Sequence, residues 1–148
     1  MVKSESGTYA LILRSDCSTR IAVGRRGLLH VQRGYYIYTG SAFGPGGVKA
    51  RVFRHCRAAH AKHWHIDYLL EVTRTLGAWC AYGSRDLEHH WAQALAAIAG
   101  VSPVPGFGSS DCACETHLFR LRSEPDFAAF SRKFPGEAEF WRFRSGDI

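Results

Sequence analysis

A glycine-rich turn, GPGG at residues 44–47, separates two different periodicities and constrains the fold more than any other stretch of the chain. Before the turn, residues 35–40 (YYIYTG) repeat with a period of two, which is typical of a β-strand and places Tyr38 and Gly40 on one face. After it, apolar residues recur at helical spacing and predict a helix over about residues 47–60. A tyrosine-rich strand therefore leads directly onto a basic helix, and the hydroxyl groups of that strand need polar partners.

Short strands and helices alternate along the rest of the chain. Strands are predicted at residues 8–14, 20–23, 28–31, 75–82 and 116–121. A helix is predicted from Asp86 to about Ala99, and a C-terminal helix from Asp126 onwards. The chain has no internal repeat and no linker, and 148 residues are enough to bury one core. We therefore predict a single domain over residues 1–148 of the α+β class, in which helices pack on a sheet.

Composition narrows the class of protein further. No apolar run approaches the length of a membrane span, and the N-terminal residues MVKSESGTYA lack the apolar core of a secretory signal, so we expect a cytoplasmic protein without a membrane partner. Five cysteines, an odd number, favour reduced thiols or a metal site over disulfides. The formal charge of +6 favours a polyanionic partner such as nucleic acid.

Five polar side chains are not needed by the predicted core: Tyr9, Tyr38, Arg51, His55 and Glu88. Arg51 and His55 are four residues apart, so they lie side by side at the edge of one helix. Glu88 borders the apolar stripe of the next helix and faces the groove between helix and sheet. Hydrolysis of a phosphodiester needs an activated water, neutralised phosphoryl oxygens and help for the leaving group, which such a set supplies. Each residue taken alone also has an ordinary structural explanation: packed tyrosines, a solvated helix edge and an acid at a helix N-terminus.

Taken in order along the chain, these residues resemble the GIY-YIG nucleases. GTY (residues 7–9) is similar to the first signature triplet of that superfamily and YTG (residues 38–40) to the second. Arg51, His55 and Glu88 match its helix pair and its metal-binding glutamate. The blocks GYYIYTGSAFGPGG, HWHIDYLL and GFGSSDCACETHLF further resemble the Uri-type endonuclease clade, and the resemblance runs from about residue 7 to about residue 122.

The resemblance implies a fold of three core strands, in a mixed or antiparallel sheet flanked by helices, and a divalent-metal-dependent endonuclease that acts on DNA in repair or processing. It implies Mg²⁺ or Mn²⁺ at Glu88, Tyr9 as general base or orienter of the attacking water, and Arg51 as the stabiliser of the phosphoryl charge. Tyr38 and His55 would support proton transfer and phosphate positioning. We expect DNA to contact Gly40, Ser41, Arg54 and Arg57. Because a free phenol has a pKa near 10, Tyr9 acts as a base only if nearby cations lower its pKa.

The chain departs from the pattern of the superfamily in three places. The two triplets are unusually far apart, which predicts an extra hairpin at about residues 19–31. Ser41 stands where some relatives carry a lysine, and Gly100 where many carry an asparagine. Leaving-group assistance would then fall to another residue, with Ser110 and Asp111 as candidates.

Three alternatives remain open at this point. His63, His65 and Asp67 are either metal ligands or hydrogen-bonded structural residues, and we favour the second. A zinc site at Cys112, Cys114 and His117 is less favoured than ordered loop residues near the active groove, because no fourth ligand is evident. The chain could also be a catalytically idle nucleic-acid-binding module on the same scaffold, with phosphate contacts from Arg25, Arg26, Arg51, Arg54 and Arg57. The substrate could be single-stranded, duplex or branched DNA.

Overall fold

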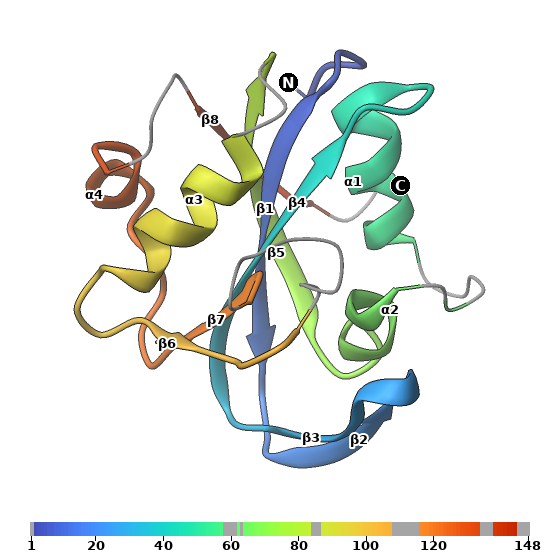
Figure 1. Ribbon diagram of the computed structural model, residues 1–148, viewed down its shortest axis with the longest axis vertical. Coiled ribbons are helices and arrows are strands. Elements are labelled where there is room, and N and C mark those ends of the chain that lie inside the picture. The colour runs from blue at the N-terminus through green and yellow to red at the C-terminus, as the bar shows by residue number, and fades with distance from the viewer. Residues whose placement is uncertain are drawn as a thin grey trace.

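The computed structural model describes residues 2–57, 62, 64–83, 87–107, 116–133 and 138–144. Its centre is an antiparallel six-stranded sheet of order β6-β7-β4-β1-β5-β8, with helices on both faces (Figure 1). The sheet strands are β1 (Gly7–Ser15), β4 (Gly34–Ala42), β5 (Arg74–Tyr82), β6 (Ser102–Pro103), β7 (Leu118–Leu121) and β8 (Glu139–Arg142). The helices are α1 (Gly47–Cys56), α2 (His65–Leu69), α3 (Leu87–Ala96) and α4 (Phe127–Ser131). A hairpin forms a separate two-stranded sheet of β2 (Thr19–Val23) and β3 (Gly27–Val31). The short 3-10 helix η1 (Gly24–Arg26) joins its two strands.

Strand β1 lies at the centre of the large sheet and is covered on both faces. Leu11 and Leu13 point into one core, together with Val48 and Val52 of α1. The alternate residues of β1 enter a second core, which includes Trp91 of α3 and Phe130 of α4. Burial on both faces explains why the run ALIL in β1 is continuously apolar instead of alternating. The result is a three-layer arrangement with α1 and α2 on one side of the sheet and α3 and α4 on the other (Figure 1).

The α+β class is confirmed, and so are the predicted strands and the extra hairpin. The three expected core strands are β4, β1 and β5, and the sheet extends beyond them. Strand β8 pairs with β5 and lies where the C-terminal helix was expected to continue, so that expectation is wrong beyond α4. Strand β6 was not predicted because two residues are too short to show a period of two.

The predicted helices are present but shorter than expected. Helix α1 ends at Cys56 because Arg57 takes an extended conformation, with φ −74° and ψ 135°. Helix α4 begins as predicted, since the Asp126 carboxylate accepts the N–H groups of Ala128 and Ala129. The expected cap of α3 at Asp86 lies outside the described residues. In the described part of the chain, no helix is long and apolar enough to cross a membrane.

Candidate active site

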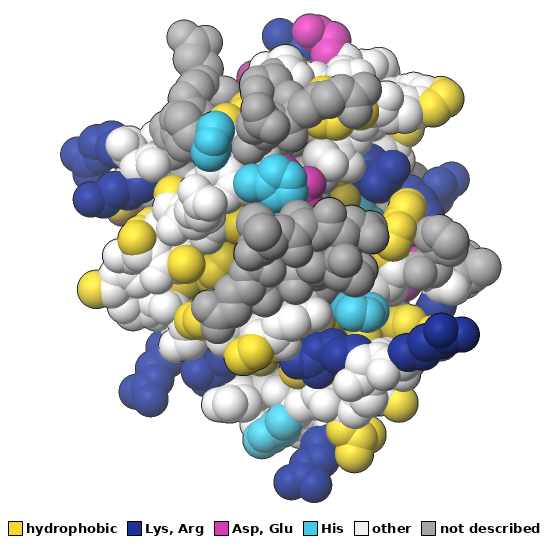
Figure 2. All heavy atoms as spheres, in the orientation of Figure 1, with side chains coloured by type: hydrophobic (Ala, Val, Ile, Leu, Met, Phe, Trp, Pro, Cys, Tyr) yellow, Lys and Arg dark blue, Asp and Glu magenta, His cyan; other side chains and the backbone are white. Residues whose placement is uncertain are grey.

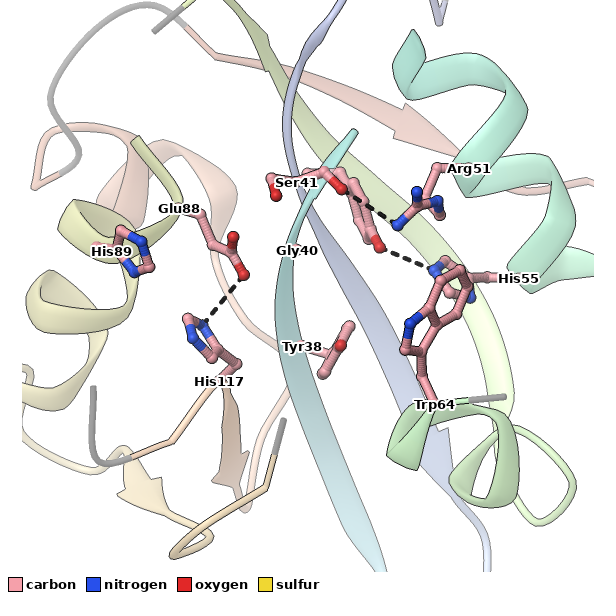
Figure 3. A pocket seen from close by; sticks show the side chains of 10 residues that line it. Tyr38, Gly40, Ser41, Arg51, His55, Trp64, Glu88, His89 and His117 are labelled. Atoms are coloured by element: carbon pink, nitrogen blue, oxygen red, sulfur yellow. Dashed lines mark hydrogen bonds and ion pairs between the residues drawn. The ribbon is translucent and has the colours of Figure 1, made fainter. Parts of the chain in front are cut away.

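A polar cavity of about 290 Å³ opens at the C-terminal end of β4 (Figure 3). It is lined by residues from both sides of the sheet: Tyr9, Tyr38, Gly40, Ser41, Arg51, His55, Trp64, Glu88, His89 and His117. All five predicted catalytic residues are among them, together with Gly40 and Ser41. Figure 3 shows Arg51, His55 and Trp64 on one side of β4, and Glu88, His89 and His117 on the other.

The two groups of side chains meet across β4 because of how this strand is paired. Among the described residues, β4 pairs with β7 only over Tyr35–Tyr38, whereas its pairing with β1 continues to Ala42. Gly40 follows this pairing segment and has no side chain to separate the two groups. It lies opposite Tyr9 in the antiparallel register, and a Cβ atom at Gly40 would collide with the Tyr9 hydroxyl. The glycine therefore allows the Tyr9 ring to reach across β4 into the cavity.

Tyr9 and His55 form a buried phenol–imidazole pair. The Tyr9 hydroxyl oxygen lies 2.8 Å from His55 Nε2. Each of the two residues is 2% exposed, so the prediction that His55 lies at the helix edge is wrong. Tyr38 contacts the same imidazole edge-on, with 6.4 Å between the ring centroids. His55 thus connects α1 to the sheet at the floor of the cavity.

The environment keeps both phenols protonated. Burial raises the pKa of Tyr9 well above its ordinary value, and the nearby Arg51 opposes this only in part. Burial and the Glu88 carboxylate raise the pKa of Tyr38 as well. Arg51 alone therefore does not lower the pKa of Tyr9 below its ordinary value, as a role for Tyr9 as a base requires. In this protein Tyr9 is suited to pass a proton on rather than to exist as a phenolate.

Arg51 is held at the rim of the cavity by two contacts. Its Nη1 donates to the Ser41 carbonyl oxygen over 3.3 Å. Its guanidinium carbon lies 4.6 Å from the centre of the Trp64 ring, a cation–π distance. Arg51 reaches the cavity from α1, on the opposite side of β4 from Glu88 (Figure 3). The guanidinium is therefore partly fixed before any ligand arrives.

Arg54 and Arg57, which are predicted to contact DNA, do not line the cavity, and their contact with DNA stays a prediction. The Arg54 guanidinium donates to both carboxylate oxygens of Asp67, over 2.9 and 3.2 Å. Asp67 is fully buried, and it also accepts the backbone N–H of Trp64 over 2.9 Å. Arg57 is exposed at the end of α1. Asp67 is therefore the hydrogen-bonded structural residue that we favoured, and it positions Trp64.

We expect Asp67→Asn to lower the free energy of unfolding by about 2 kcal/mol, because it leaves the largely buried Arg54 guanidinium without its carboxylate. Urea unfolding followed by tryptophan fluorescence measures this change. Glu71→Gln is the matched control, since Glu71 forms only an exposed ion pair with Lys62 and should cost no more than about 0.5 kcal/mol. Equal effects of the two substitutions would contradict the structural role of Asp67.

Of the other cavity residues, Trp64 and His89 were not predicted, and His117 was considered only as a ligand of a zinc site. His117 Nδ1 lies 3.0 Å from Thr39 Oγ1 and 3.5 Å from the Glu88 carboxylate. His89 lies close by, with 6.0 Å between its ring centroid and that of His117. Burial lowers the pKa of His117, while Glu88 raises it in part. The neutral imidazole can therefore both donate and accept a proton beside the Glu88 carboxylate.

The donor set around Glu88 fits a hard divalent cation bound together with an anionic ligand. The Glu88 side chain is 18% exposed, and among the described residues no group of three or more His, Cys, Asp or Glu side chains forms a metal cage. Mg²⁺ commonly takes one or two carboxylates, keeps several waters and completes its shell with phosphate oxygens. One carboxylate at the wall of an open cavity is sufficient for such binding.

Several predicted residues lie outside the described part of the chain or away from the cavity. His63, Ser110, Asp111, Cys112 and Cys114 are outside the described residues, so the zinc and leaving-group predictions for them stay untested. His65 packs against Phe107, with ring centroids 5.4 Å apart. Gly100 lies in a turn after α3 and does not line the cavity.

The fold and the cavity define an α+β protein with a polar site across one end of a central strand. The model of the family described as "Domain of unknown function DUF123" matches residues 8–138, and the chain belongs to this family. No curated protein and no solved structure matches the chain significantly.

Proposed function

We propose that this protein is a divalent-metal-dependent endonuclease of the GIY-YIG superfamily, similar to the Uri-type enzymes, that hydrolyses DNA phosphodiester bonds. The observation that carries the proposal is the convergence of Tyr9, Arg51 and Glu88 on one cavity from three separate elements, β1, α1 and α3. Each residue type suits a different requirement of phosphodiester hydrolysis. Tyr9 also packs in the core, whereas Arg51 and Glu88 are not members of either hydrophobic core.

Proton transfer from the attacking water is assigned to Tyr9 and His55. In the neutral imidazole tautomer whose Nε2 carries no hydrogen, the Tyr9 hydroxyl donates to His55 over 2.8 Å. The phenol oxygen then accepts the proton of a water as its own proton moves to His55. This relay avoids a free phenolate, in agreement with the raised pKa of Tyr9. Tyr38, beside the same imidazole, supports the position of the phosphate.

Charge on the phosphoryl group is neutralised from two directions. Arg51 presents a fixed guanidinium, whose planar fork is suited to phosphate oxygens. Glu88 would hold Mg²⁺ or Mn²⁺, which supplies Lewis-acid stabilisation of the phosphoryl oxygens when bound. His89 and His117 lie next to Glu88 and are candidates for protonating the leaving oxygen, in place of the asparagine found in many relatives.

The alternative is a nucleic-acid-binding module without catalytic activity. The position of Glu88 favours the enzyme over this alternative. A carboxylate in the wall of a phosphate-binding cavity repels its ligand unless a cation is bound between them. A module selected only for binding has no use for such a group, whereas an enzyme that recruits a metal ion requires it.

Cleavage of labelled oligonucleotides tests the proposal directly. Single-stranded, duplex and branched DNA are incubated with the protein and either Mg²⁺ or Mn²⁺, and the products are separated on denaturing gels. We expect cleavage of at least one substrate, abolished by EDTA and restored by excess metal ion. A Glu88→Gln preparation purified in parallel controls for contaminating nucleases. Binding to all three substrates without cleavage of any would favour the binding module.

A further inference from the structure

The hairpin of β2, η1 and β3 carries a charge pattern that the cavity does not explain. Residues 19–31 contain three arginines and one histidine and no acidic residue. Val23, Leu29 and Val31 are buried in the core shared with α2. The alternate positions face outwards: Arg20 and His30, which are cross-strand partners, and Leu28, which is 73% exposed. The hairpin therefore buries one apolar face and exposes the cations Arg20, on β2, and Arg25, in its turn.

These cations are not neutralised by neighbouring acids. Among the described residues, neither Arg20 nor Arg25 lies within ion-pair distance of a carboxylate. Asp16 is bound by Arg14 and Arg74, and Asp67 by Arg54. The charge on the outer face of the hairpin is therefore available for an anionic partner. Figure 2 shows Lys and Arg side chains around η1 and at the end of the molecule where the hairpin lies.

Arg26 connects the turn of the hairpin to the cavity. Its Nη2 donates to the Pro105 carbonyl oxygen over 3.0 Å, and its guanidinium carbon lies 5.9 Å from the Phe107 ring centroid. The same Phe107 ring is buried and lies 6.0 Å from the Tyr38 ring. One aromatic ring thus separates the anchoring arginine from a residue that lines the cavity. Since one DNA strand rises by about 3.4 Å per nucleotide, a DNA bound in the cavity reaches the turn of the hairpin within a few nucleotides.

We propose that this hairpin is a second phosphate-binding element, in which Arg20 and Arg25 contact the DNA backbone a few nucleotides from the bond that is cleaved. The inference rests on the proposed function, because it assumes that the cavity binds DNA. Arg26 acts as an anchor that fixes the hairpin beside the cavity, while the two exposed arginines bind. Phosphate contacts of this kind position a nucleic acid without reading its sequence. The hairpin therefore contributes to affinity and substrate length and leaves the chemical step to the cavity.

The test is the salt dependence of binding in EDTA, where cleavage does not interfere. The Arg20→Ala/Arg25→Ala double variant is compared with the wild type by fluorescence anisotropy on a labelled duplex of about 20 base pairs. We expect roughly tenfold weaker binding at about 100 mM salt and a smaller slope of log affinity against log salt, reduced by about two. Because neither arginine lines the cavity, the effect of the double substitution should appear in the affinity and in the salt slope.

A control with the same loss of charge is Arg132→Ala/Lys133→Ala, at the exposed end of α4. We expect it to bind within about twofold of the wild type, with an unchanged slope. Thermal melting of both double variants should match the wild type because the replaced side chains are exposed. Equal affinity and slope for the hairpin variant and the wild type would overturn the hairpin inference while leaving cleavage intact. If the double substitution weakens binding but the wild type cleaves no DNA, the proposed enzymatic function is overturned instead.

Discussion

Glu88→Gln should abolish Mg²⁺- or Mn²⁺-supported DNA cleavage, with a loss of at least about a thousandfold. The amide keeps the size of the side chain and can still contact His117, which lies 3.5 Å from the carboxylate in the wild type. What it removes is the negative charge that holds the cation. DNA affinity measured in EDTA should be unchanged or higher, because one negative charge has left a phosphate-binding cavity. Cleavage, oligonucleotide affinity and melting temperature are measured on the same preparation.

If Glu88 has only a structural role, we expect a different result for Glu88→Gln. An acid in the first turn of a helix contributes a few tenths of a kcal/mol through the helix dipole, so its loss would lower the melting temperature slightly and leave activity intact. Glu71→Gln, which neutralises an exposed acid away from the cavity, serves as the control for removal of a charge. Activity of Glu88→Gln within a few fold of the wild type would place the metal ion elsewhere.

The central strands were predictable because their signals are local, whereas the charged residues of the site were singled out by the resemblance to the GIY-YIG nucleases and not by spacing alone. The period of two in β4 placed Tyr38 and Gly40 on one face, and both residues line the cavity. The apolar stripe of α3 placed Glu88 at the edge of the buried face, where the structure has it. In each case the periodicity of the strand or helix that carries a side chain determines the direction of that side chain.

Other parts of the site depend on contacts between distant segments, and no local pattern reveals them. The collision that makes Gly40 necessary exists only because the strand register sets it opposite Tyr9. The pairing of Arg54 with Asp67 of α2 joins two separate helices, so no pattern within α1 predicts it. His117 was considered only as a zinc ligand, because its distance to Glu88 depends on how α3 packs on the sheet. The burial that raises the pKa of Tyr9 is likewise a tertiary property that the sequence does not reveal.

Arg51→Ala should lower the cleavage rate at saturating DNA by about a hundredfold or more, which corresponds to about 3 kcal/mol of transition-state stabilisation. The guanidinium acts on charge that develops on the phosphoryl group, so the loss should fall mainly on kcat. Stability should fall by no more than about 1 kcal/mol, because Arg51 gives up only a hydrogen bond to Ser41 and a contact with Trp64. Single-turnover cleavage and urea unfolding measure the two effects separately.

Two further variants show whether the shape of the guanidinium matters or only its charge. Arg51→Lys keeps the positive charge but loses the planar fork that is held against Trp64, so we expect an intermediate rate, about tenfold below the wild type. Arg57→Ala removes an exposed arginine at the end of the same helix, outside the cavity, and should leave kcat within about twofold. Normal turnover by Arg51→Ala would remove Arg51 from the catalytic set. If Arg57→Ala lowers kcat as much as Arg51→Ala does, the helix contributes through its overall charge. We expect Arg51→Ala to be far slower than Arg51→Lys, and Arg57→Ala to be close to the wild type. This order of rates follows only if one guanidinium contacts the reacting phosphate.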